Sequence, residues 1–134
     1  MAGYSGTPLP AKLGIKPGFL VLVVNEPANY RLLLAPLPES VTFVKKLTNA
    51  VDLIHLFTKS AAELDTKLRA WRREMKPEAT IWVSWPKKAS KVATDITEDV
   101  IRDVALPMGL VDVKVCAVDE TWSGLKLVIR KELR

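Results

Sequence analysis

Residues 13–27 read LGIKPGFLVLVVNEP and hold the clearest secondary-structure signal in the chain. A turn that contains Gly14 and Gly18 leads into six consecutive apolar residues, 19–24, of which three are valine. An unbroken apolar run of this length is typical of a strand buried on both faces, as the strands of parallel sheets are. The run ends before Pro27, because proline cannot continue a central ladder of hydrogen bonds. This stretch therefore predicts the first strand of an α/β sheet.

The rest of the chain alternates between predicted strands and predicted helices. Strands are expected at residues 41–46, 51–57, 80–85, 111–118 and 125–129, and helices at 30–34, 60–75 and 95–108. The alternation predicts an α/β fold, a small Rossmann-like sheet of about six mostly parallel strands with helical crossovers. The last two strands should form an antiparallel C-terminal hairpin, because the link 119–124 is too short for a parallel crossover.

Two details of the predicted elements carry more specific expectations. In the helix over 60–75, four apolar residues recur on one face: Leu64, Leu68, Trp71 and Met75. Ser60 with Glu63, and again Asp95 with Glu98, have the spacing of a capping box, which is a better account of the Asp95 region than a phosphate site. The link between strands 41–46 and 51–57 is too short for parallel neighbours. The earlier strand is therefore either short and irregular or runs in the opposite direction.

Length and composition indicate one cytoplasmic domain. A chain of 134 residues fits a single domain, 1–134, and residues 1–12 are expected to be an extended N-terminal segment. Cys116 is the only cysteine and His55 the only histidine, so neither an internal disulfide nor a zinc site is expected, and no metal is predicted. The N-terminus lacks the features of a signal peptide, and the longest apolar run is too short to cross a bilayer.

These elements, in this order, resemble the class I methyltransferase fold. The resemblance lies in residues 13–18, 51–54, 75–83 and 108–113 together with the closing antiparallel strand. Such methyltransferases place a glycine-rich turn after the first strand, where the backbone approaches S-adenosylmethionine. This chain instead has Asn25-Glu26-Pro27, and Lys45 and Lys46 stand where the resemblance implies an acidic ribose-binding residue. The chain is therefore expected to be a degenerate methyltransferase-like domain without a cofactor.

At closer range the sequence is similar to a bacterial family, domain of unknown function 3052. The similarity is carried by residues 3–9, 85–90 and 113–126, and it runs nearly from end to end. The family brings no established activity, so it assigns a role to no residue of this chain.

The predicted topology gathers polar and aromatic residues at one edge of the sheet. Ligands of open parallel sheets bind beyond the carboxyl ends of the strands. The candidate ligand-binding residues at that edge are Asn25, Glu26, Trp85, Lys87, Lys88, Asp119, Glu120 and Trp122. Trp85 and Trp122 could form an apolar platform, with Lys87 and Lys88 placed for an anion. The alternative is that the tryptophans cover the end of the sheet and the lysines are solvated.

Three functions are compatible with this site. The first is a non-catalytic domain that binds a small anionic ligand or a protein partner, and it predicts no catalytic residue. The alternative is an enzyme that acts on a small anionic substrate with Glu26 or Asp119 as the base, or a divergent methyltransferase. The last is association with nucleic acid, which is not expected, because the basic residues of helix 60–75 are interspersed with acidic ones. His55 is expected to be a satisfied core residue and Cys116 a small apolar side chain.

Overall fold

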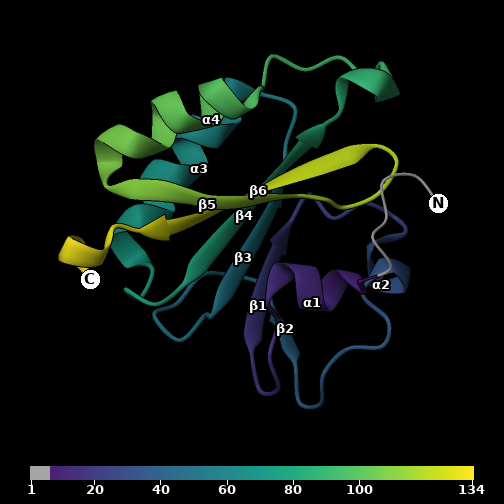
Figure 1. Ribbon diagram of the computed structural model, residues 1–134. Helices are drawn as coiled ribbons and strands as arrows, with labels where there is room; N and C mark the ends of the chain where they lie inside the picture. Colours follow the sequence, from purple (N-terminus) through teal and green to yellow (C-terminus); the bar gives the residue numbers. More distant parts are fainter. Residues whose placement is uncertain (1–6) are drawn as a thin grey trace.

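The computed structural model describes residues 7–134, and within them the chain forms a six-stranded sheet in the order β2-β1-β3-β4-β6-β5 (Figure 1). The strands are β1 (Leu20–Val24), β2 (Thr42–Val44), β3 (Leu53–Phe57), β4 (Thr80–Pro86), β5 (Leu110–Ala117) and β6 (Trp122–Ile129). Strand β1 pairs in parallel with β2 and β3, and β3 pairs in parallel with β4. Strand β6 is antiparallel to both β4 and β5. The predicted mostly parallel sheet with a C-terminal antiparallel hairpin is confirmed.

Helices cover both faces of the sheet. In the described residues, α1 (Leu9–Leu13) and α2 (Tyr30–Leu33) lie on one face, and α3 (Ala61–Glu74) and α4 (Glu98–Ala105) on the other (Figure 1). Short 3₁₀ helices follow at η1 (Lys88–Ser90), η2 (Leu106–Met108) and η3 (Lys131–Leu133). Across residues 7–134, none of the helices combines the length and the apolar character that crossing a bilayer requires.

Helix α1 corrects the expectation of an extended segment over residues 1–12. Leu9 and Leu13 are four residues apart, and both are buried against the sheet, which stabilises a helical turn there. Gly14 ends the helix in the left-handed conformation with φ of 80°. Residues 1–6 of the expected segment lie outside the described residues.

Strand β2 resolves the question of the short link to β3. The strand has only three residues, and it does not pair with β3, because β1 lies between the two. The strand runs parallel to β1, so the alternative of the opposite direction is wrong. Leu47 and Val51 of the link are buried in the same cluster as Leu22 of β1. The link therefore packs on the sheet directly, without the helix that a crossover between parallel strands normally carries.

The helix caps differ from the predicted capping boxes. Ser60 accepts from the Glu63 amide at 3.2 Å as predicted, but the Glu63 carboxylate bonds to other groups and not to the Ser60 amide. The cap of α4 is Thr97, whose hydroxyl accepts from the Val100 amide at 3.1 Å. Asp95 instead accepts from the first amide of α3, that of Ala61, at 2.7 Å. The second box is therefore wrong, because α4 begins later than the spacing suggested.

The apolar stripe of helix α3 is confirmed, since Leu64, Leu68, Trp71 and Met75 are all buried. The other face of the sheet contains a buried polar group, His55. Its Nδ1 atom is 2.8 Å from the Tyr30 hydroxyl, and its Nε2 atom is 2.7 Å from the Ser84 hydroxyl. Burial lowers the pKa of His55 to about 3, so the ring is neutral. The prediction of a satisfied core histidine is confirmed.

Candidate functional site

The loop after β1 closes onto β3 through a side chain. Asn25 has a left-handed backbone with φ of 61°, a conformation that asparagine tolerates better than most residues. Its amide Nδ2 donates to the Phe57 carbonyl at 2.9 Å and to Glu63 Oε1 at 3.2 Å. Glu63 Oε1 also accepts from the Thr58 hydroxyl at 2.5 Å. The first strand therefore ends in a side-chain bridge to the start of α3.

Glu26, the next residue of this loop, is bonded toward α2. Its carboxylate accepts from Arg31 Nε at 3.1 Å, and the Arg31 guanidinium lies 3.7 Å from the centre of the Phe43 ring in β2. Glu26 and Arg31 are both exposed. This ion pair and the cation–π contact connect the loop to β2.

Asp119 shapes the turn between β5 and β6. Its Oδ1 atom accepts from the backbone amides of Thr121 and Trp122, each at 2.8 Å, and its Oδ2 atom accepts from Asn29 Nδ2 at 3.4 Å. The Thr121 carbonyl in turn accepts from the Lys87 amide at 2.7 Å. Asp119 therefore positions the turn next to the end of β4.

We expect Asp119→Ala to destabilise the protein by about 1–3 kcal/mol, because two turn amides lose a charged acceptor. Urea unfolding measures the loss. Asp119→Asn is the matched control, since its amide oxygen can still accept from both amides, and we expect it to lose less than half as much. Equal losses for the two variants would contradict this role.

One cavity at this edge lies between the end of β4 and the start of α4. It has a volume of about 460 Å³. It is lined by Trp85, Pro86, Lys87, Lys88, Lys91, Val92, Ala93, Thr94, Ile96, Thr97 and Glu98. We call it the lysine groove, after Lys87, Lys88 and Lys91. In the part of the chain that the structure describes, none of these three lysines forms an ion pair with a carboxylate.

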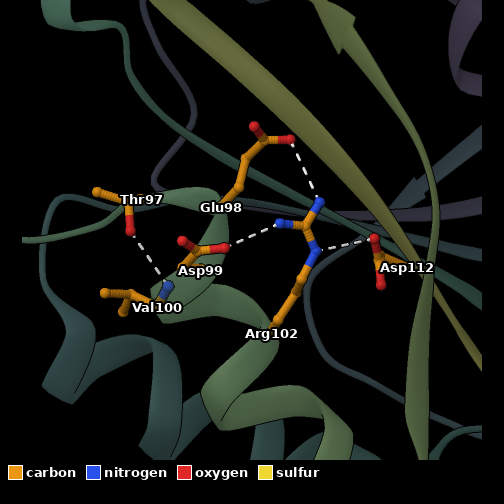
Figure 2. Close-up of polar contacts among 6 residues, drawn as sticks. All are labelled: Thr97, Glu98, Asp99, Val100, Arg102 and Asp112. Atoms are coloured by element: carbon orange, nitrogen blue, oxygen red, sulfur yellow. Dashed lines mark hydrogen bonds and ion pairs between the residues drawn. The ribbon is translucent and has the colours of Figure 1, made fainter.

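The one carboxylate among the described lining residues, that of Glu98, is engaged elsewhere. Figure 2 shows the Arg102 guanidinium between three carboxylates, with Glu98 at 3.5 Å, Asp99 at 3.2 Å and Asp112 of β5 at 3.0 Å. The hydrogen bond to Asp112 is the main cause that raises the pKa of Arg102. Arg102 thus compensates the charge of Glu98, and the groove keeps the positive charge of its lysines.

A second cavity, of about 380 Å³, lies at the carboxyl ends of β1 and β3. Its lining residues are Asn25, Phe57, Thr58, Lys59, Ser60, Glu63 and Trp122. The Trp122 ring packs edge-on against Phe57, with the ring centres 5.1 Å apart. This cavity therefore combines an aromatic wall with the Glu63 carboxylate. Among residues 7–134, no group of three or more His, Cys, Asp or Glu side chains is placed to hold a metal ion.

The structure divides the predicted site residues between these two cavities. Trp85, Lys87 and Lys88 line the lysine groove, whereas Asn25 and Trp122 line the second cavity. The predicted apolar platform of two tryptophans is wrong. Trp85 pairs with Ser123 across the ladder and Trp122 with Pro86, so the two tryptophan side chains point to opposite faces of the sheet.

The remaining predicted residues line neither cavity. Glu26 faces Arg31, Asp119 holds its turn, and Glu120 is exposed. Two residues that sequence reasoning missed are Lys91 and Glu63. Lys91 lies three residues after Lys88, which the sequence analysis did name, whereas Glu63 was assigned to a capping box.

No family model matches the chain, and no curated protein sequence matches it, so membership of domain of unknown function 3052 stays a prediction. Solved structures do match. One is a putative type 11 methyltransferase from Sulfolobus solfataricus, with 14% identity, a TM-score of 0.65, and coverage of 92% of this chain and 90% of that one. Another is a SAM-dependent methyltransferase from Aquifex aeolicus, with 17% identity, a TM-score of 0.63, and coverage of 90% and 87%. The chain therefore has a methyltransferase-like Rossmann fold.

The residues at the end of β1 do not fit S-adenosylmethionine in the mode usual for this fold. That mode needs a glycine-rich turn with free backbone amides, but Pro27 has no amide and its carbonyl accepts from the Tyr30 amide at 3.1 Å. The Asn25 side chain is already bonded to Phe57 and Glu63. After β2, the exposed Lys45 stands where a ribose-binding carboxylate would be expected.

Proposed function

We propose that this protein is a non-catalytic domain with a methyltransferase-like fold that binds a small anionic ligand in the lysine groove. The observation that carries the proposal is the set of three lysines, Lys87, Lys88 and Lys91, around one cavity. Its one described lining carboxylate, Glu98, is paired with Arg102 and not with these lysines. Ammonium groups gathered in this way repel one another, and an anion between them relieves that repulsion.

The groove also indicates what else the ligand contains. Trp85, Val92 and Ile96 supply apolar surface, and a lysine is a point charge without the planar fork of arginine. The two threonine hydroxyls are used within the protein, because Thr94 donates to the Lys59 carbonyl at 2.8 Å and Thr97 caps α4. The ligand class that fits is an anion attached to an apolar or aromatic body.

The absence of a free general base in the groove favours binding over catalysis. Of the described residues that line the groove, only Glu98 carries a carboxylate, and Arg102 engages it. The two carboxylates considered as bases, Glu26 and Asp119, lie outside the groove and are bonded to Arg31 and to turn amides.

Calorimetric titration with phenyl phosphate tests the proposal, since this probe joins a dianion to an aromatic ring. We expect measurable binding that Lys88→Ala/Lys91→Ala weakens about tenfold, which corresponds to about 1.4 kcal/mol. The melting temperature should barely change, because both side chains are exposed. The matched control is Lys45→Ala/Lys46→Ala, which removes the same charge from exposed positions after β2 and should leave binding unchanged. Binding that both variants weaken equally would contradict a specific groove.

A divergent methyltransferase is the second candidate, and the second cavity is the observation that favours it. That cavity lies at the carboxyl ends of β1 and β3 and contains Glu63 beside Trp122. The same calorimeter separates the two candidates. Micromolar binding of S-adenosylmethionine that Glu63→Gln abolishes would overturn the non-catalytic proposal, whereas we expect no heat of binding.

A further inference from the structure

Four lysines from distant parts of the sequence meet on the sheet face that carries α1. Lys114 of β5 and Lys126 of β6 are directly opposed in the antiparallel ladder. Lys126 is also opposed to Trp82 of β4, whose ring packs under α1, so the Lys126 side chain points to the α1 face. Lys12 of α1 reaches β5, where its Nζ atom donates to the Ala117 carbonyl at 3.3 Å.

Lys16, which follows α1, completes the group. It lines a cavity of about 350 Å³ together with Lys126. Lys12 and Lys114 line another cavity, of about 380 Å³, next to it. Burial lowers the pKa of Lys126, and the charges of Lys114 and Lys16 lower it further. We call the surface formed by Lys12, Lys16, Lys114 and Lys126 the basic face.

This arrangement works against the stability of the folded protein. Like charges directly opposite each other on neighbouring strands are destabilising, with Cβ atoms about 5 Å apart. Of the described carboxylates nearby, Asp52 bonds to Lys76 at 2.5 Å and to the Leu20 amide at 2.8 Å. Glu78 is exposed at the rim of the Lys16 cavity. The opposed pair itself has no carboxylate partner among residues 7–134, and such a local conflict is expected at functional sites.

Within residues 7–134, Lys114 of the basic face is exposed and Lys126 is half-buried. Among the described elements, α4 packs on the other side of β5, and the α1 side of β5 and β6 leaves Val111, Cys116 and Val128 only half-buried. Two neighbouring cavities with an opposed lysine pair between them form an extended row of charges on a sheet surface. An extended row of point charges matches a ligand with repeated negative charges better than it matches one small ion.

We propose that the basic face binds the phosphodiester backbone of a nucleic acid. Lysines without arginine forks hold phosphates without reading bases, so the binding is independent of sequence. The site differs from the lysine groove, which lies at the carboxyl edge of the sheet. It also differs from the basic surface of helix α3, where Asp65 pairs with Arg69 at 3.0 Å and compensates its charge.

Fluorescence anisotropy with a labelled 20-nucleotide single-stranded RNA at 50 to 200 mM NaCl tests the proposal. We expect binding that falls linearly on a double logarithmic plot of affinity against salt. Lys114→Gln/Lys126→Gln should weaken binding about tenfold at 50 mM NaCl and reduce the slope by about 1.4, the value for two lost phosphate contacts on a single strand. Arg69→Gln/Arg73→Gln removes the same charge from α3 and serves as the control. This variant should bind RNA like the unchanged protein.

The urea midpoint of each variant shows whether a loss of RNA binding comes from unfolding or from the lost charge. Lys114→Gln relieves the repulsion within the opposed pair, so its urea midpoint should be equal to or higher than that of the unchanged protein. Loss of RNA binding in this single variant then cannot come from unfolding. The proposal is overturned by an absence of binding at 50 mM NaCl, by an equal loss in the α3 control, or by tighter binding to phosphatidylglycerol vesicles than to RNA.

Discussion

Acidification from pH 7 to pH 4 is expected to lower the free energy of unfolding by about 3 kcal/mol through His55 alone. The side chain is fully buried, and burial lowers its pKa to about 3, whereas the unfolded chain has the ordinary value of about 6.5. Below pH 6.5 His55 becomes protonated in the unfolded state but stays neutral in the folded state until the pH approaches 3. The stability that neutral His55 contributes is therefore complete above pH 6.5 and decreases as the pH falls toward 3.

Urea unfolding at pH 7, 6, 5 and 4 measures this loss, which is small between pH 7 and pH 6 and approaches about 1.4 kcal/mol per pH unit between pH 6 and pH 4. The control removes the titrating ring together with its two partners, as Tyr30→Phe/His55→Leu/Ser84→Ala, because a single His55 substitution would leave two buried hydroxyls without partners. We expect the triple variant to have a flatter pH dependence. If its slope between pH 6 and pH 4 equals that of the unchanged protein, His55 is not the group responsible.

The buried histidine is connected to the second cavity through stacked rings. His55 stacks on Phe57 at 4.2 Å, and Tyr30 meets Phe57 edge-on at 5.3 Å. Phe57 in turn forms the cavity wall with Trp122. The Tyr30 hydroxyl bond to His55 also fixes the short helix α2 on the sheet. Protonation of His55 would therefore loosen the loop that follows β1 as well as the core.

The elements of the fold could be predicted where one periodicity dominates. The strand at residues 19–24 and the helix with the stripe from Leu64 to Met75 were predicted correctly, because apolar runs and apolar stripes follow from burial alone. Helix α1 was missed, because Pro8 and Pro10 obscure a single turn whose stability comes from tertiary packing of Leu9 and Leu13. The position of β2 could not be predicted either, since sheet order depends on contacts between strands that are distant in the sequence.

In the candidate sites, too, features set by a continuous stretch of sequence could be predicted, and features set by contacts between distant strands could not. The lysine groove comes largely from one continuous run, residues 85–91, and three of its lining residues, Trp85, Lys87 and Lys88, were among the candidates chosen from the sequence. The tryptophan platform failed because the faces of Trp85 and Trp122 depend on strand register, and a shift of one residue reverses the face. The basic face joins Lys12 to Lys114 and Lys126, about a hundred positions further along the chain, so only the folded sheet brings these charges together.

Trp82→Ala should destabilise the protein by about 3–5 kcal/mol, because it opens a large cavity in the core. Trp82 is fully buried on the α1 face, and its indole Nε1 atom donates to the Leu13 carbonyl at 2.9 Å. The substitution therefore removes the ring beneath α1 and leaves the Leu13 carbonyl without its donor. Thermal and urea unfolding measure the effect, and Trp122→Ala is the control, since that ring is only half-buried and should cost less.

Two milder substitutions, Trp82→Phe and Gly124→Ala, test the same role of the indole ring if Trp82→Ala does not fold. Trp82→Phe retains most of the ring and loses the donor, for which we expect about 1–3 kcal/mol. The ring is also the reason for Gly124 on β6, because a Cβ atom there would lie 3.2 Å from Trp82 Cε3. Gly124→Ala should consequently cost less in the Trp82→Phe background than in the unchanged protein, and a double-mutant cycle measures that coupling. Additive losses would mean that the glycine is required by Ser84 and Val118, its other neighbours, and not by the indole that anchors α1.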